Sequence, residues 1–162
     1  MDHELTEAVI KVQFISGTSW TSRAIEWFSA GGFSHVDAVL PDGDLLGARS
    51  DNIGGGKGVL IRPASYEEWA QRKIFTLVAT HGQEAMFRRF LNEQLNKPYD
   101  HTAIWGFATG RDWREADSWF CSELIAAALE YSGALPVLYS PVNKVTPATL
   151  ATVLSAVGAI AS

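Results

Sequence analysis

Cysteine is almost absent from this sequence, because Cys121 is the only one among 162 residues. A lone cysteine cannot form an internal disulfide, so a disulfide-stabilised scaffold is excluded and the fold does not depend on redox compartment. Basic side chains are also few: 13 Lys and Arg against 18 Asp and Glu give a formal net charge of −5. Nucleic acid is therefore not the expected partner, since phosphate-binding surfaces need a basic patch.

Long apolar segments are missing from both ends of the chain. The first residues, "MDHELTEAVIKVQF", lack the basic region and apolar core of a signal peptide. The apolar C-terminal stretch, "TPATLATVLSAVGAIAS", is too short and too rich in Ala, Ser and Thr for a membrane span, and predicts a packed terminal helix. We therefore expect a cytoplasmic protein without membrane association, unless a phage or a dedicated secretion system delivers it.

The pattern of apolar residues predicts one α+β domain over residues 1–162. Strands are expected at residues 8–15, 33–40, 45–48, 59–63 and 73–79, where apolar and polar residues alternate or β-branched residues cluster between turn signals. Helical spacing is strongest later in the chain. Strands that come first and helices that gather late indicate a mostly antiparallel sheet covered by helices. Nothing in the sequence indicates the oligomeric state.

Two capping-box patterns mark expected helix starts. Ser65 and Glu68 predict a short helix through Trp69, and Thr80 and Gln83 predict a longer one. The buried stripe expected for the longer helix comprises Met86, Phe87, Phe90, Leu91 and Leu95. Pro98 forbids continuation of that helix beyond the following turn.

The stretch "DSWFCSELIAAALE" predicts a helix that presents Cys121 near its start. Ser118 is the expected N-cap, which places Cys121 at the third helical position, where free amides and the helix dipole favour the reactive thiolate. Glu123 reads most simply as a first-turn acid that complements the dipole or ties down a loop. The alternative for Cys121 is a small buried residue that only fills space.

A nucleophilic cysteine needs a base and a group that orients the base. The four histidines, all before Cys121, are His3, His35, His81 and His101. His3 lies near the terminus, helix capping explains His81, and His101 remains an alternative in an aromatic-rich loop.

His35 has the better context, because it begins a predicted strand. The strand period of two places His35 and Asp37 on the face opposite Val36 and Ala38. A histidine with only a structural role is the alternative. A second alternative is that His35 and Asp37 form half of a metal site, but the H-x-D pattern is a weak signal and a metal would need further ligands.

These fragments together resemble the circularly permuted branch of the NlpC/P60 cysteine hydrolases. The resemblance rests on "FSHVDAVLPDGDLLGA", "KPYD" and "WFCSELIAAALEYSG", and runs from about residue 14 to about residue 135. It is closest to the YiiX/YebB-like group, in which the histidine strand precedes the cysteine helix. The resemblance implies a papain-like fold, in which an antiparallel sheet packs against the helix that carries the nucleophile.

The resemblance also implies roles for individual residues. Cys121 would be the nucleophile and His35 the base, and Tyr99 would lie beside the cleft. Substrate contacts are expected from Tyr99, Trp119 and Ser34, which lies beside the histidine. Trp119 forms a sequence cluster with Trp105 and Trp113, and core packing is the alternative role for these tryptophans.

One position departs from the family pattern. Related proteins carry a third polar residue on the strand after the histidine strand, about where this sequence has Gly47. Asp37 is the preferred substitute, because it shares a strand face with His35, although direct contact would need favourable rotamers. Arg49, Asp51, a main-chain carbonyl or a water are the alternatives.

The expected function is therefore cysteine-dependent hydrolysis of an amide or related acyl bond, such as that of a cell-wall peptide, through an acyl-enzyme. The substrate would be a peptide or an acyl-containing small molecule, and no metal or organic cofactor is expected. Two alternatives stay open. One is a lipid acyl hydrolase or acyltransferase that uses the same Cys and His pair. The other is a binding module without turnover, which Gly47 makes credible.

Overall fold

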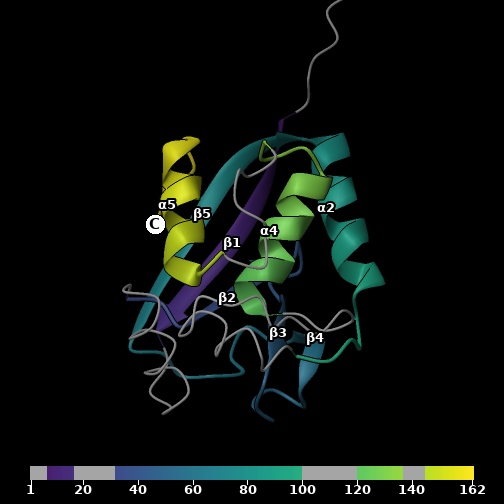
Figure 1. Ribbon diagram of the computed structural model, residues 1–162, viewed down its shortest axis with the longest axis vertical. Coiled ribbons are helices and arrows are strands. Elements are labelled where there is room, and N and C mark those ends of the chain that lie inside the picture. Colours follow the sequence, from purple (N-terminus) through teal and green to yellow (C-terminus); the bar gives the residue numbers. More distant parts are fainter. Residues whose placement is uncertain (1–6, 17–31, 100–119, 137–144) are drawn as a thin grey trace, which may run out of the picture.

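A computed structural model describes residues 7–16, 32–99, 120–136 and 145–162. Six strands in this part of the chain form one antiparallel sheet of order β4-β3-β2-β1-β5-β6 (Figure 1). The strands are β1 (Glu7–Ser16), β2 (His35–Val39), β3 (Leu45–Arg49), β4 (Gly58–Arg62), β5 (Gln71–Thr80) and β6 (Ile160–Ala161). All five strands expected from the sequence are present, and the antiparallel α+β prediction is confirmed.

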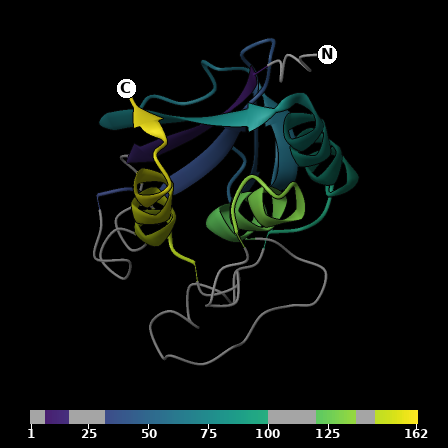
Figure 2. The ribbon, with the colours of Figure 1, turned by 90° about the horizontal axis from the view of Figure 1, so that it is seen from above.

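Three helices within the described residues accompany the sheet: α2 (His81–Glu93), α4 (Cys121–Tyr131) and α5 (Pro147–Ala156). Helices α4 and α5 lie on one face of the sheet, and α2 packs beside α4 (Figure 2). Helix α4 contacts β2 and β3, as expected for the helix that carries Cys121. The packed terminal helix expected near the C-terminus is α5, which buries Leu150 and Leu154.

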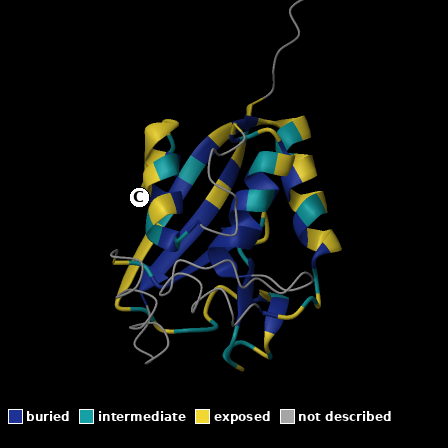
Figure 3. Cartoon of the chain, viewed as in Figure 1, coloured by how far each residue is buried: buried dark blue, intermediate teal, exposed yellow. Residues whose placement is uncertain are grey.

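The apolar core fills the space between the sheet and α4 (Figure 3). Phe14 on β1 is fully buried and meets Phe75 of β5 edge to face, with ring centroids 5.1 Å apart. Val36 and Ala38 of β2 face the same core as Leu124 and Ile125 of α4. Burial of these side chains supplies the main driving force for packing α4 onto the sheet.

The start of α2 has the predicted capping box. The Thr80 hydroxyl accepts a hydrogen bond from the Gln83 amide at 3.1 Å, and the Gln83 side chain accepts one from the Thr80 amide at 2.9 Å. Phe87 and Leu91 are buried as expected, and Phe90 and Leu95 are partly buried. The prediction for Met86 is wrong, since 43% of its surface is exposed. Met86 precedes Phe87 by one residue, so its side chain points about 100° around the helix axis from that of Phe87 and away from the narrow buried stripe.

The second capping-box prediction is wrong, because residues 63–70 form turns and bends without a helix. Tyr66 and Glu67, which the short helix would have contained, bond instead to Asp37 and Arg49 of the sheet. These tertiary hydrogen bonds outweigh the local propensity for a single helical turn. Among the described residues, no helix is both long enough and apolar enough to cross a membrane.

Candidate active site

Helix α4 begins at Cys121 itself, so the predicted register is wrong by two positions. The N-cap is Phe120, which provides no side-chain cap, and Ser118 lies outside the described residues. The Glu123 carboxylate instead accepts a hydrogen bond from the Phe120 amide at 3.1 Å, which stabilises the first turn as a first-turn acid can. Cys121 is the first helical residue, and its side chain is fully buried.

His35 is the first residue of β2, and the sheet register sets its direction. It pairs with Ile15 of β1, and Asp37 pairs with Gln13, so these four residues share one side of the two strands. His35 and Asp37 are both buried, and His35 Nε2 lies 2.8 Å from Asp37 Oδ1. The contact is therefore direct, without a bridging water.

The Cys121 side chain lies within hydrogen-bonding reach of His35, and together Cys121 and Asp37 determine the charge of the His35 imidazole. Burial by itself lowers the pKa of His35, but the charge and hydrogen bond of Asp37, together with those of Cys121, outweigh burial and raise it to about 9. Burial likewise raises the pKa of Asp37, but His35, Tyr66 and Arg49 outweigh it and hold the pKa below its ordinary value. At neutral pH the pair is therefore an imidazolium and a carboxylate.

Gly47 explains how Asp37 reaches its position. The β2–β3 register pairs Ala38 with Leu46, and its continuation sets Asp37 opposite Gly47. A Cβ atom at residue 47 would lie 1.9 Å from Asp37 Oδ1. The Asp37 carboxylate thus occupies the volume that a side chain at residue 47 would fill, and only glycine there admits it.

The segment after β4 supplies a side chain that the sequence analysis did not identify. The Tyr66 hydroxyl donates a hydrogen bond of 2.7 Å to Asp37 Oδ2, the carboxylate oxygen that does not face His35. Burial is the largest cause that raises the pKa of Tyr66, and the negative charge of Asp37 raises it further, so the phenol keeps its proton. No local pattern marks Tyr66, because it lies in a turn and meets Asp37 only in the folded chain.

Arg49 donates a hydrogen bond to Tyr66. Among the described residues, it forms no hydrogen bond with His35 or Asp37. One guanidinium nitrogen donates to Tyr66 Oη at 3.0 Å and to Glu67. Two others form a bidentate pair with Asp51, at 2.9 and 2.8 Å. Arg49 and Asp51, two of the alternatives for the third position, therefore support Tyr66 and do not touch the imidazole.

A second arginine, Arg62, holds the main chain around the site. It is 1% exposed and donates to the Gly47 carbonyl at 3.0 Å and to the Gly56 carbonyl at 2.8 Å. Its guanidinium also lies over the Tyr66 ring, 5.9 Å from the centroid. Arg62 thus ties β3, the loop before β4 and Tyr66 into one arrangement.

The expected substrate-binding residues lie in three different settings. Tyr99 is buried against Phe120, the residue before Cys121, with ring centroids 5.8 Å apart. Ser34 is 1% exposed, and its amide and hydroxyl both face the Ile15 carbonyl, at 2.9 and 3.4 Å. Trp119 lies outside the described residues, as do Trp105, Trp113, His3 and His101. His81 is exposed at the start of α2.

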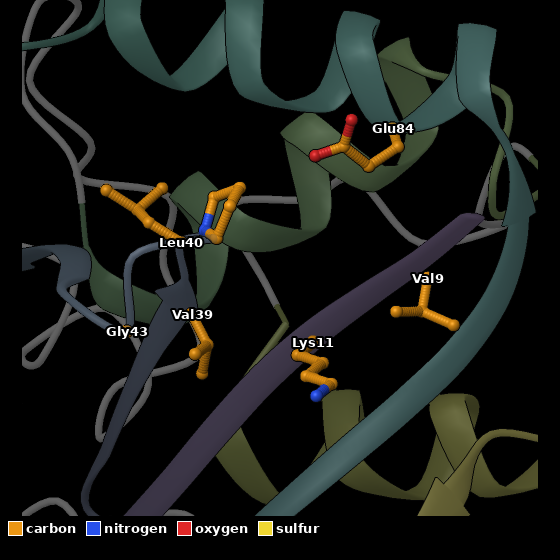
Figure 4. A pocket seen from close by; sticks show the side chains of 7 residues that line it. Val9, Lys11, Val39, Leu40, Gly43 and Glu84 are labelled. Carbon is orange, nitrogen blue, oxygen red and sulfur yellow. The ribbon is translucent and has the colours of Figure 1, made fainter.

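A surface pocket of about 300 Å³ lies elsewhere on the molecule, between β1, the β2–β3 turn and α2 (Figure 4). Lys11 of β1 and Glu84 of α2 lie at opposite sides of it, and Val9, Val39 and Leu40 supply apolar walls. Glu84 is already paired with Arg88. The pocket contains none of the candidate catalytic residues, so it is not the place where Cys121 would meet a substrate.

No protein-family model matches the sequence, and no curated protein matches it. Among solved structures, the fold is similar to the crystal structure of metalloprotein YiiX from Escherichia coli O157:H7, DUF1105. The two chains are 18% identical, the match covers 84% of this chain and 77% of that chain, and the TM-score is 0.55. At this identity the likeness shows the fold alone, which is YiiX-like.

The description as a metalloprotein is that of the YiiX structure. Within the part of this chain that the structure describes, no three or more His, Cys, Asp and Glu side chains are grouped to hold a metal ion. The contacts of Asp37 with His35 and Tyr66, and those of Asp51 with Arg49, leave these side chains engaged with protein donors. The described residues therefore do not fit a metal.

Proposed function

We propose that this protein is a cysteine hydrolase of the permuted NlpC/P60 type, which cleaves an amide or related acyl bond through an acyl-enzyme on Cys121. The observation that carries the proposal is the buried imidazole of His35, held between the Cys121 thiol on one side and the Asp37 carboxylate on the other. A nucleophile, a base and an orienting acid in contact make up the arrangement that nucleophilic catalysis needs.

The chemistry follows from which ring nitrogen each neighbour uses. Since Asp37 bonds to Nε2, Nδ1 is the atom that exchanges a proton with the thiol. The thiolate attacks the carbonyl carbon and forms a C–S bond, and the imidazolium then gives its proton to the leaving nitrogen or oxygen as the bond of that atom to the carbonyl carbon breaks. Water next transfers a proton to His35 and attacks the thioester, and the acid leaves as the C–S bond breaks. The Cys121 amide at the start of α4 is the proposed oxyanion donor.

Asp37 also bears on the alternative of an inactive binding module. That alternative rested on Gly47, which cannot orient an imidazole. Because the Asp37 carboxylate fills the space beside Gly47 and reaches His35 directly, the lack of a side chain at residue 47 is no reason to expect loss of turnover. Cys121 has no exposed surface, so a substrate reaches the sulfur only when the side chains that cover it move apart.

The test uses 4-nitrophenyl acetate, an activated acyl ester, as a probe of the thiol. The parent protein should release nitrophenol and carry an acetyl group on Cys121, which mass spectrometry of the quenched protein would locate. Cys121→Ala should do neither, and Tyr131→Phe, a change at a half-exposed residue at the far end of α4, should match the parent. Equal turnover by the parent and Cys121→Ala would contradict the proposal.

A further inference from the structure

A continuous chain of hydrogen bonds leads from Arg49 to His35. Arg49 bonds to Tyr66 Oη at 3.0 Å, Tyr66 bonds to Asp37 Oδ2 at 2.7 Å, and Asp37 Oδ1 bonds to His35 Nε2 at 2.8 Å. Three of the four residues come from β2 and β3, and Tyr66 comes from the turns after β4. The chain brings together side chains that the sequence separates by up to 31 positions.

The donors and acceptors in this chain can be oriented in only one way. A guanidinium only donates hydrogen bonds, so the Tyr66 oxygen must accept from Arg49. The single phenolic proton is then left for Asp37 Oδ2, and Asp37 accepts it as a carboxylate. A carboxylate has no proton to give, so His35 Nε2 must carry the hydrogen of the last bond.

We propose that Tyr66 is a positioning residue, with Arg49 fixing the direction of its hydroxyl, so that Asp37 holds His35 in the Nε2–H tautomer and Nδ1 is left to accept the proton of Cys121. The inference rests on the proposed function for its catalytic meaning, but the tautomer itself does not depend on turnover. Tyr66 would touch neither substrate nor thiol, and would act through Asp37 alone.

The surroundings keep this chain in one geometry. Asp51 holds the guanidinium of Arg49 through two bonds, Glu67 accepts a further one, and the Arg49 carbon lies 5.2 Å from the centre of the Tyr66 ring. The Asp37 and Arg49 side chains are nearly inaccessible to water, with 1% and 5% exposed. Water therefore cannot readily replace the Tyr66 hydroxyl as the donor to Asp37 Oδ2. Loss of the hydroxyl would leave this buried carboxylate oxygen without its hydrogen bond from Tyr66.

The first measurement is the ¹⁵N NMR signature of His35 in Cys121→Ala protein, at a pH where the imidazole is neutral. The alanine background removes the Cys121 sulfur, which would otherwise form its own hydrogen bond with the imidazole. The expected spectrum has a pyrrole-like Nε2 and a pyridine-like Nδ1, and His35→Gln in the same background assigns the signals. Adding Tyr66→Phe should move both nitrogens toward values averaged over two tautomers, whereas Tyr131→Phe should not. An unchanged Nε2–H signature in Tyr66→Phe would overturn the inference.

The second measurement separates this inference from the proposed function. With Cys121 present, Tyr66→Phe should lower kcat for 4-nitrophenyl acetate about tenfold and leave KM nearly unchanged, the loss expected for one hydrogen bond. If neither the parent nor the variants hydrolyse the ester but the NMR change occurs, the function fails and the tautomer inference stands. If the ester is hydrolysed and Tyr66→Phe has the kinetics and spectrum of the parent, the inference fails alone.

A second variant guards against failure of Tyr66→Phe to fold. Arg49→Lys keeps the positive charge beside Asp51 and Glu67 but loses the planar donor fork that fixes Tyr66. Circular dichroism would establish that it is folded. The His35 signals should then shift in the same direction by a smaller amount, and signals identical to those of the parent would overturn the inference.

Discussion

The two faces of β2 differ in what surrounds them, although both are buried. Val36 and Ala38 are fully buried among the apolar side chains of α4 and the sheet. His35 and Asp37 alternate with them along the same strand and are nearly as buried, yet their side chains are linked by hydrogen bonds to each other and to Tyr66. Burial alone therefore does not distinguish the apolar face of β2 from its polar face.

The difference has an energetic meaning. Apolar burial stabilises the fold directly, whereas a buried charge must recover its lost hydration through partners. Replacing a buried ionic network by apolar side chains of similar volume is often neutral or stabilising. The polar face of β2, together with Arg49, Arg62 and their partners, is thus poorly explained by stability and better explained by the chemistry proposed for Cys121.

Removing the base should give the largest difference between the two faces. We expect His35→Ala to lower the alkylation rate of Cys121 near neutral pH and the ester turnover by about 10²–10⁴-fold, the usual contribution of a general base. Cys121 is the only cysteine, so iodoacetamide incorporation reports on this thiol alone. Val36→Ala, on the other face, is the matched control and should keep most of both rates. Parent-like alkylation by His35→Ala would remove His35 from the site.

The position of the carboxylate can be tested by moving it from β2 to β3. Asp37→Gly should lower turnover strongly, though less than His35→Ala. Gly47→Asp should lower both turnover and stability, because the new Cβ atom would lie 1.9 Å from Asp37 Oδ1. The double variant Asp37→Gly with Gly47→Asp removes the clash and returns one carboxylate to the same volume. Its turnover and stability should exceed those expected from the sum of the single changes, with a coupling energy of about 1–3 kcal/mol. Simple additivity would contradict the idea that the two positions share one space.

Much of the fold could be predicted from the sequence, because its signals are local. The alternation of Ile10, Val12 and Phe14 predicted β1, and the Thr80 and Gln83 pattern predicted the start of α2. The start of α4 was placed wrongly: the helix begins at Cys121, and the Glu123 carboxylate accepts a hydrogen bond from the amide of the N-cap residue Phe120.

The surroundings of His35 were only partly predictable. The two-residue spacing put Asp37 on the same face as His35, but the sequence did not show whether the two side chains would touch. Tyr66 could not be found, because its contact with Asp37 spans 29 positions and has no periodic signal. The same long-range contacts account for the missing helix at residues 63–70, where the local pattern competed with the sheet.

The polar face should also make stability depend on pH. The pKa of His35 is raised from 6.5 to about 9, so its contribution is complete below about pH 6.5 and is lost as the pH rises through 9. The loss should approach about 3 kcal/mol in the free energy of unfolding. Asp37 has a lowered pKa, so its contribution is present above its ordinary value of 3.8 and is lost as the pH falls below it.

Urea unfolding of the parent between pH 6 and pH 10 would measure this loss, and Asp37→Asn supplies the comparison. Without the carboxylate, the main cause that raises the pKa of His35 disappears, so the decline between pH 6.5 and 9 should shrink. A parent whose stability stays flat across this window would show that His35 is not held as an imidazolium by Asp37.

The apolar face should respond through packing alone. Val36→Ala removes buried surface between β2 and α4, and we expect the free energy of unfolding to fall by about 2 kcal/mol. The pH dependence of stability should keep the shape seen in the parent, since no titratable group is changed. Urea unfolding at three pH values would check both statements, and a changed pH profile would mean that the two faces are coupled through the strand.

The smallest effect is expected at Ser34, where β2 meets β1 just before His35. The Ser34 amide donates a good hydrogen bond to the Ile15 carbonyl at 2.9 Å, whereas the hydroxyl contact with the same carbonyl is long, at 3.4 Å. Ser34→Ala keeps the amide bond to Ile15 and removes the hydroxyl with its long contact to the same carbonyl, so the free energy of unfolding should fall by about 1 kcal/mol. Because the Ser34 side chain is buried against the main chain, KM for 4-nitrophenyl acetate should stay close to that of the parent. A several-fold rise in KM with unchanged stability would instead place Ser34 in contact with the substrate.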